Sequence, residues 1–100
     1  MAIGNLVIDG STRTALLTGK PLSLTTYEFS LLRVLAERAG RVLAREQLLQ
    51  LLQGTAEEVF DRSIDVHVSR LRHKLGDDPR HPRLLKTIRG AGYMLTPDDP

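Results

Sequence analysis

The strongest constraint on the fold of this chain comes from residues 61–75, which combine a narrow apolar stripe with a polar and basic face. Ile64, Val68, Leu71 and Leu75 recur at steps of four, three and four. On an α-helix of about 3.6 residues per turn, this spacing brings all four side chains onto one line. Such a stripe has to be buried against a core, so we predict an amphipathic helix over residues 61–75.

The opposite side of this helix carries hydroxyls, imidazoles and guanidiniums around one exposed valine. The residues opposite the stripe are Arg62, Val66, Ser69, Arg70 and His73, with Asp65 and Arg72 on one flank and Ser63, His67 and Lys74 on the other. A helix in the major groove of DNA carries such a set, because cations bind phosphates, arginine forks pair with guanine edges and methyl groups contact thymine. A solvated helix face is the alternative, and the helical wheel alone is compatible with both.

Charge is distributed unevenly along the chain. The formal net charge is only +2, but residues 61–96 hold eight Lys/Arg against four Asp/Glu. Basic charge concentrated in one segment is the footprint expected of a nucleic-acid surface. The chain has only two Tyr and two Phe, which argues against a single-strand binder, because such proteins stack bases on exposed rings.

Several function classes lack support in the sequence. Cysteine is absent, which excludes disulfides and thiolate metal sites and fits a cytoplasmic protein. No apolar run approaches the ~18 residues of a membrane span, and no secretory leader is visible. His67, His73 and His81 lack the spacing of metal ligands, and Asp61 and Asp65 fit an N-cap and a surface carboxylate. We therefore expect no enzyme, no cofactor, no metal and no membrane contact.

Residues 1–96 are expected to form one domain, followed by an acidic tail at 97–100. Short apolar stretches between turn signals predict strands at residues 6–8, 13–17 and 22–24, as parts of a small antiparallel sheet. Thr25 and Glu28 form a capping-box pattern that predicts a core helix over residues 25–39. A second helix is expected over residues 45–52, with Ala44 as a poor N-cap.

After a loop at residues 76–83, the strands expected at 84–89 and 93–95 form a hairpin around Gly-Ala-Gly. Thr87 and Arg89 project to the side opposite Ile88. Three helices, the last one basic, followed by this hairpin outline an α+β winged helix-turn-helix with an N-terminal antiparallel sheet and the hairpin as wing. Arg89 is then placed to enter a narrow minor groove, and a solvated arginine beside a glycine turn is the alternative.

Four motifs carry a resemblance to a known family. They are LTTYEFSLL at residues 24–32, VLAREQLL at 42–49, RSIDVHVSRLRHKL at 62–75 and KTIRGAGY at 86–93. In this order and spacing they closely resemble the OmpR/PhoB-type effector domain of bacterial two-component response regulators, over about residues 6–95. The resemblance implies a four-stranded N-terminal sheet, three helices and a C-terminal hairpin that the segment around Val42 joins.

The resemblance also implies a ligand and residue roles. The ligand is double-stranded DNA, bound by two copies head to tail on a direct repeat. By matched position, Asp65, Val66, Arg70 and Arg72 look like base-facing residues, with Asp65 orienting arginines. Phosphate contacts are expected from Arg62, Ser63, His67, Ser69, His73 and Thr87, and a minor-groove contact from Arg89. The loop of Gln53, Gly54, Thr55, Ala56, Glu57 and Glu58 resembles the one that such activators present to RNA polymerase.

Three positions depart from the family pattern: Ala44 replaces a usual Ser, Leu52 a frequent Trp and Met94 a common basic residue. Family members normally begin with a phosphoacceptor receiver domain, so the resemblance implies an effector domain whose receiver domain is absent from this chain and belongs to the full-length protein. The rival function is a winged helix used for protein contact, with its basic face solvated. A steep fall of affinity with salt would favour DNA binding over that rival.

Overall fold

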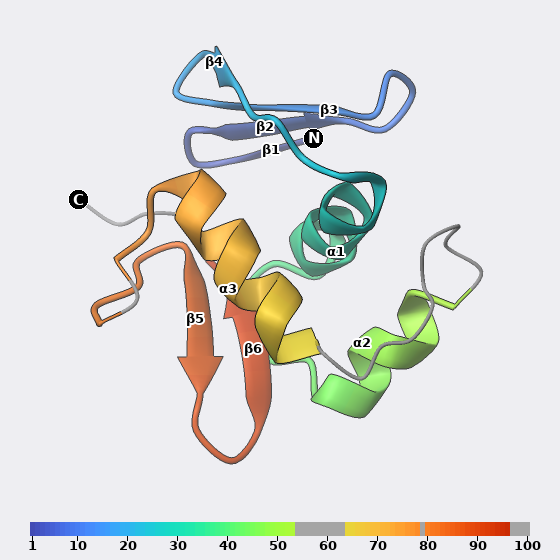
Figure 1. The fold of residues 1–100 in the computed structure, drawn as a ribbon, viewed down its shortest axis with the longest axis vertical. Coiled ribbons are helices and arrows are strands. Elements are labelled where there is room, and N and C mark those ends of the chain that lie inside the picture. The colour runs from blue at the N-terminus through green and yellow to red at the C-terminus, as the bar shows by residue number, and fades with distance from the viewer. Residues whose placement is uncertain (54–63, 79, 97–100) are drawn as a thin grey trace.

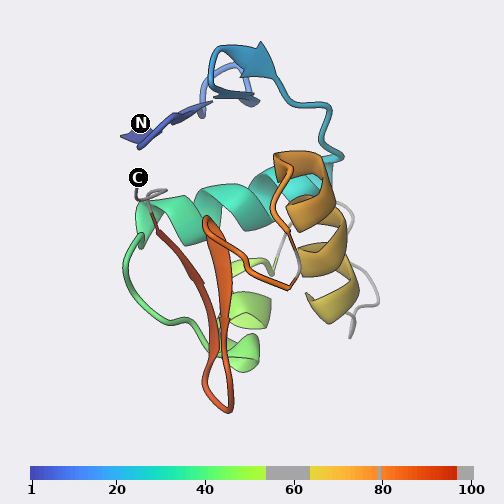
Figure 2. The same cartoon turned by 90° about the vertical axis from the view of Figure 1, so that its left-hand side faces the viewer.

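The computed structural model describes residues 1–53, 64–78 and 80–96. Its elements are β1 (Ala2–Ile3), β2 (Leu6–Asp9), β3 (Thr14–Leu17), β4 (Lys20–Pro21), α1 (Thr26–Glu37), α2 (Arg45–Leu51), α3 (Ile64–Leu75), β5 (Leu85–Ile88) and β6 (Gly92–Leu95). The N-terminal sheet lies over α1, and the β5–β6 hairpin points away from it (Figure 1 and Figure 2). Within the described residues, this confirms the predicted α+β winged helix.

The N-terminal sheet has the order β1-β2-β3-β4, with every neighbouring pair antiparallel. Its inner face is apolar, because Leu6, Ile8 and Ala15 are at most 2% exposed, whereas Val7 and Leu16 point outward. This alternation with a period of two is typical of a sheet with one buried face.

Two details of the predicted sheet are wrong. The strand expected at residues 22–24 does not form, and the fourth strand is Lys20–Pro21. Leu22 and Leu24 are instead partly buried against the core. The strand Ala2–Ile3 is not predicted by the sequence, since two residues are too few to show an alternating pattern.

Helix α1 begins as the sequence predicts. Thr25 is its N-cap: Oγ1 of Thr25 accepts from the Glu28 amide at 3.1 Å, and Oε1 of Glu28 accepts from the Thr25 amide at 2.9 Å. The helix ends at Glu37, two residues before the expected Ala39. Phe29, Leu31, Leu32, Leu35 and Ala36 are buried along it, which makes α1 the central element of the core.

Helix α2 is short and has only half of a capping box. Ala44 offers no side-chain acceptor, as expected, but its amide donates to Oε1 of Gln47 at 2.8 Å. The helix ends at Leu51, one residue earlier than predicted. Leu48 and Leu52 anchor it, with exposed fractions of 0% and 2%.

Helix α3 buries the predicted stripe. Ile64, Val68, Leu71 and Leu75 are 0%, 1%, 0% and 6% exposed. The predicted first turn, residues 61–63, lies outside the described residues. Because all four buried positions lie on one line of the helix, the side chains on the opposite line must face solvent.

An ion pair between a partly exposed lysine and a buried glutamate joins α3 to α1. Nζ of Lys74 lies 2.6 Å from Oε1 of Glu28, whose side chain is only 4% exposed. Burial raises the pKa of the Glu28 carboxyl, but hydrogen bonds from Lys74 and Thr25 outweigh it and hold the pKa below its ordinary value. The same carboxylate therefore caps α1 and binds the C-terminal half of α3.

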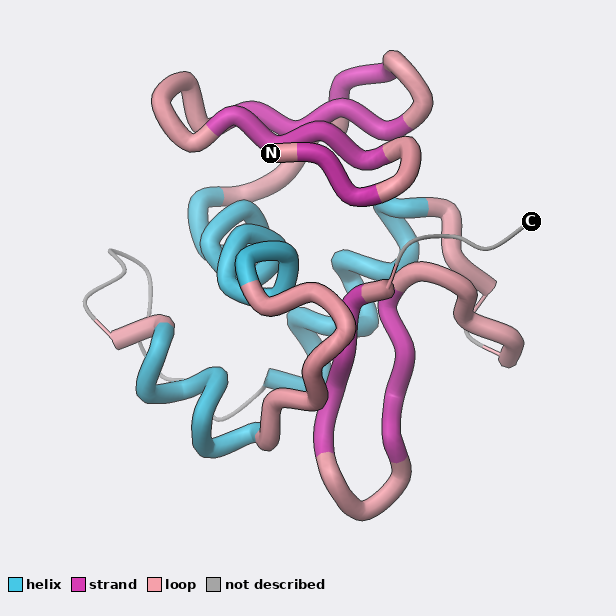
Figure 3. Tube along the Cα trace, turned by 180° about the vertical axis from the view of Figure 1, so that it is seen from behind, coloured by secondary structure: helices cyan, strands magenta, loops and turns pink. Residues whose placement is uncertain are grey.

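The C-terminal hairpin is paired through backbone hydrogen bonds with the segment that follows α1. Leu43 and Tyr93 form an antiparallel bridge, in which the Leu43 amide donates to the Tyr93 carbonyl at 2.8 Å and the reverse bond is 2.9 Å. The segment around Val42 thus joins the hairpin through Leu43, and Figure 3 shows the loop after α1 running beside the hairpin. No helix within the described ranges is long and apolar enough to cross a membrane.

Gly92 permits this close approach of the two backbones. A Cβ at Gly92 would lie 2.1 Å from the carbonyl oxygen of Leu43, and its φ of +146° is a conformation that L side chains rarely adopt. We predict that Gly92→Ala lowers the free energy of unfolding by roughly 3 kcal/mol or more, from backbone strain plus overpacking. Urea unfolding would measure it.

Gly90→Ala is the matched control for that change. Gly90 also has positive φ, +76°, but a Cβ at this position would meet no atom within 4 Å. The substitution should therefore cost only about 1–2 kcal/mol. Equal losses for both variants would show that the contact with Leu43 does not constrain the hairpin.

The Glu28–Lys74 pair predicts a second set of measurements. Lys74→Met removes the ammonium, so burial should then dominate and raise the pKa of Glu28, as a carboxyl ¹³C NMR titration would show. A carboxyl with a depressed folded-state pKa stabilises the fold above its unfolded pKa, and this contribution is lost as the pH falls through the folded pKa. The wild type should therefore exceed Lys74→Met in stability at neutral pH, by a margin that shrinks in acid.

Arg33→Met serves as the control for this pair. Arg33 pairs with Glu37 at 3.1 Å on the exposed side of α1, with side chains 44% and 41% exposed. Removing an exposed pair of this kind should change stability by less than about 1 kcal/mol. An unchanged Glu28 pKa in Lys74→Met would contradict the assigned role of the ammonium.

Candidate nucleic-acid interface

The solvent side of α3 presents the polar face that the helical wheel predicts. Val66 is 45% exposed, which is high for an apolar side chain in a helix that buries its opposite line. Ser69, Arg70 and His73 are exposed on the same helix. The Arg70 side chain forms no ion pair or hydrogen bond with another described residue, so none of these residues competes with a ligand for its guanidinium.

Asp65 is bound by two side chains from other elements. Both of its carboxylate oxygens accept from Nη2 of Arg45, at 3.0 and 2.8 Å, and Oδ1 also accepts from the Tyr93 hydroxyl. The expectation that Asp65 orients an arginine fits this geometry, but the arginine comes from α2 and not from α3. Arg45, Asp65 and Tyr93 thus connect α2, α3 and β6 at a point one residue pair before the turn of the hairpin.

The ionisation of this group follows from its contacts. The hydrogen bond from Tyr93, followed by that from Arg45, lowers the pKa of the Asp65 carboxyl. Burial, followed by the hydrogen bond to Asp65, raises the pKa of the Tyr93 hydroxyl. At neutral pH, Asp65 is therefore an anion and Tyr93 a neutral donor, as the hydrogen bond between them requires.

Arg72 is engaged with the hairpin. Its Nε donates to the Leu85 carbonyl at 2.9 Å, and its Nη2 donates to Oγ1 of Thr87. The guanidinium also lies over the Tyr93 ring, 5.9 Å from the centroid. The assignment of Arg72 and Thr87 to separate DNA contacts remains a prediction, and the structure adds a direct bond between them.

His67 is placed differently from the exposed residues of α3. Its ring is half-buried and lies 4.4 Å from the Tyr27 ring, centroid to centroid, with the planes tilted by 49°. A phosphate contact from His67 would therefore come from the edge of the helix that faces α1. Arg62, Ser63 and the loop residues 54–58 lie outside the described residues, and Gln53 is exposed after α2.

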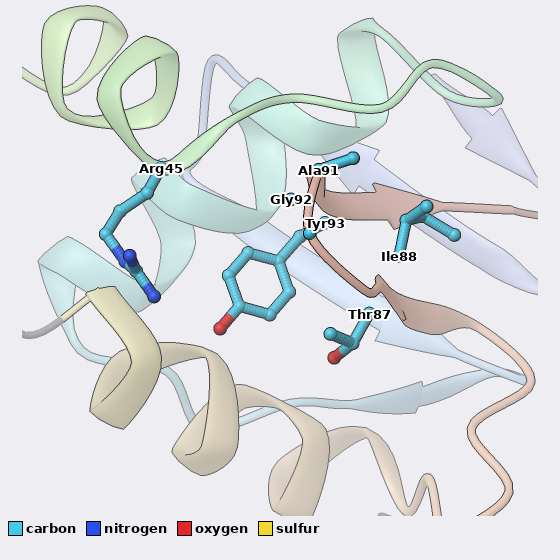
Figure 4. Close-up of a pocket in the computed structure, with 7 residues that line it drawn as sticks. Arg45, Thr87, Ile88, Ala91, Gly92 and Tyr93 are labelled. Carbon is cyan, nitrogen blue, oxygen red and sulfur yellow. The ribbon is translucent and has the colours of Figure 1, made fainter.

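The hairpin presents Arg89 at its exposed turn. Thr87 and Arg89 are exposed, and Ile88 between them is half-buried, as the predicted alternation requires. A shallow pocket of about 280 Å³ lies between the start of α2 and the hairpin. Figure 4 shows Arg45, Tyr93 and Thr87 around this pocket, with their polar ends directed towards α3.

Sequence reasoning missed Arg45, Tyr93 and Leu85 as partners of the α3 side chains. Arg45 and Tyr93 lie in two of the four family motifs, so the motifs contain both residues. The sequence could not show that they bind Asp65, because they lie 20 and 28 positions away from it along the chain. Leu85 contributes only a backbone carbonyl, which no side-chain pattern can signal.

Known proteins match this chain over nearly its whole length. Residues 19–95 match the family model described as "Transcriptional regulatory protein, C terminal". Transcriptional regulatory protein RstA of Escherichia coli K12 is 43% identical over 94 residues, which cover 94% of this chain and 39% of RstA. Protein PetR of Rhodobacter capsulatus is 46% identical over 84 residues, which cover 79% of this chain and 35% of PetR. The chain thus spans little more than a third of these relatives.

Solved structures show the same fold. The DNA-binding domain of Klebsiella pneumoniae RstA, in complex with the RstA box, is 40% identical with a TM-score of 0.86, covering 97% of this chain and 96% of that one. The DNA-binding domain of CpxR from Escherichia coli is 37% identical with a TM-score of 0.78, covering 99% and 97%. The chain therefore belongs to the OmpR/PhoB-type family of transcriptional regulatory protein C-terminal domains, which are DNA-binding domains of response regulators and not enzymes.

Proposed function

We propose that this domain binds duplex DNA in a sequence-specific manner, with α3 in the major groove and Arg89 of the hairpin wing in the adjacent minor groove. The observation that carries the proposal is the division of α3 into a fully buried stripe and an exposed face. That face holds Val66 and Arg70, and the flanking residues Asp65 and Arg72 bind the wing. The similar RstA domain, which was solved in complex with the RstA box, supports a DNA ligand.

The proposed contacts divide by chemistry. Arg70 presents a guanidinium fork suited to guanine, and Val66 presents methyl groups suited to thymine. Ser69, His73 and Thr87, with Arg62, Ser63 and His67, are proposed to bind phosphates. Asp65 is proposed to belong to the base-facing set through its orienting role. Arg72 differs from Arg70 in that its guanidinium is bound to strand β5 of the wing.

Two further parts of the proposal rest on the family resemblance. The loop at residues 53–58 is proposed to contact RNA polymerase, and a receiver domain is proposed to control the domain in the full-length protein. The chain covers 43% of the response regulator DrrB of Thermotoga maritima, with 41% identity and a TM-score of 0.81. That partial coverage of a longer regulator supports an effector role within a larger protein.

A salt titration tests DNA binding against the rival function, protein contact through a solvated basic face. Binding that neutralises phosphates releases counterions, so the logarithm of the affinity should fall linearly with the logarithm of salt concentration. The slope should be roughly −0.9 per phosphate contacted. Fluorescence anisotropy with a labelled duplex would measure it. A flat response, or no binding at low salt, would favour the rival.

Selection of bound duplexes from a random pool tests base reading and site arrangement. We expect two direct half-sites, since two copies are proposed to bind head to tail. Arg70→Ala should flatten the preference at one base pair of each half-site, by about 1–3 kcal/mol. Arg80→Ala is the control, because Arg80 is exposed on the loop after α3. An unchanged consensus for Arg70→Ala would contradict its base-reading role.

A further inference from the structure

We propose that Arg72 is a positioning residue, which holds the wing in place on α3 so that Arg89 reaches the minor groove. This inference rests on the proposed function, because it assigns to Arg72 a step in the reading of DNA by the wing. It also separates Arg72 from Arg70, although the two arginines lie two positions apart on the same helix.

One edge of the Arg72 guanidinium binds strand β5 through two hydrogen bonds. Nε and Nη2 point in the same direction, and they donate to the Leu85 carbonyl and the Thr87 hydroxyl respectively. The two acceptors are a backbone carbonyl and a side-chain hydroxyl two residues further along the same strand. A planar fork fits this pair of acceptors, and a single ammonium cannot match both.

The same guanidinium also contacts the second strand of the wing. It lies over the Tyr93 ring on β6, and Tyr93 is the register partner of Thr87. The pair Thr87–Tyr93 is followed by only one more pair, Ile88–Gly92, before the turn that carries Arg89. Arg72 therefore contacts both strands of the wing close to the turn that carries Arg89, so these contacts restrain the position of Arg89.

The wing has fewer anchors on β5 than on β6. Each strand has four residues in a two-stranded sheet. Strand β6 is anchored by the buried Leu95, by the bond from the Gly40 amide to the Leu95 carbonyl, by the Leu43–Tyr93 bridge and by the bond from Tyr93 to Asp65. Strand β5 is anchored by Leu85, which is buried in the core, at its end away from the turn. A two-stranded hairpin is marginally stable by itself. Without the contacts of Arg72, the end of β5 that leads to Arg89 would lose its hydrogen bonds to α3 and would depend on its pairing with β6.

The hydrogen bonds between Arg72 and β5 also limit how Arg72 can contact a DNA base directly. The Nε–Nη2 edge is one of the two forks with which a guanidinium can pair with guanine, and here it is occupied by the protein itself. Arg70 has no such engagement among the residues that the structure describes. Arg70→Ala is therefore the matched control for every measurement on Arg72.

The first test needs no DNA. Amide hydrogen exchange of residues 85–95 should be faster in Arg72→Lys, on the order of tenfold, because two hydrogen bonds that restrain the wing are lost while the positive charge stays. Arg70→Ala should leave these rates unchanged, and the core of α1 should stay protected in both variants. Wing exchange rates equal to wild type in Arg72→Lys would overturn the inference.

The second test couples Arg72 to Arg89 through a double-mutant cycle. Affinities are measured for one site with A·T-rich and with G·C-rich flanks, in wild type, Arg72→Lys, Arg89→Ala and the double variant. The inference expects Arg89→Ala to abolish the flank preference, Arg72→Lys to remove most of it, and the double variant to lose nothing more. Arg70→Ala should keep the flank preference.

The outcomes separate the inference from the function on which it rests. If Arg89→Ala loses the flank preference and Arg72→Lys keeps it, the positioning role is wrong and direct base reading by Arg72 is favoured. If the wild type has no flank preference, the proposed minor-groove role of Arg89 is wrong. The exchange measurement still decides in that case whether Arg72 holds the wing.

Discussion

The burial of four side chains along one line of α3 is the constraint on which the interface depends. Ile64, Val68, Leu71 and Leu75 can all be buried only at one rotation of the helix. A helix advances by about 100° per residue, so a shift of one position would turn Val66 and Arg70 away from solvent and expose the stripe. The core thereby selects which side chains can meet a ligand, although none of its residues touches one.

Polar contacts fix the position of α3 more closely than apolar packing can. Lys74 binds Glu28 on α1, Asp65 binds Arg45 and Tyr93, and Arg72 binds β5. These bonds leave α3 from its first and last turns, towards four different elements, α1, α2, β5 and β6. Apolar packing is non-directional, whereas hydrogen bonds fix particular atoms at particular distances. The hydrogen bonds therefore fix the rotation of α3 and its position along its own axis, in addition to the burial of its apolar side.

The sequence was sufficient for the architecture and insufficient for the contacts between distant elements. The capping box at Thr25, the stripe of α3 and the glycine turn of the wing are local signals, and each appears in the structure where it was expected. The strand at Lys20–Pro21 was misplaced because a two-residue strand has no periodicity. The role of Gly92 depends on the carbonyl of Leu43, which no local pattern reveals.

The number of basic residues on α3 overstates the positive charge that this helix has available for DNA, because some of these residues are already bound within the protein. Of the three Lys/Arg cations that the structure describes on α3, Lys74 is bound to a buried carboxylate and Arg72 to the wing, which leaves Arg70 exposed for a ligand. A cation already engaged within the protein gains less from a phosphate, because the internal contact has to be given up or shared. The sequence specificity that we propose for this domain accordingly depends on a few groups, Arg70 and Val66 on the helix and Arg89 on the wing, and on the internal bonds that hold helix and wing together.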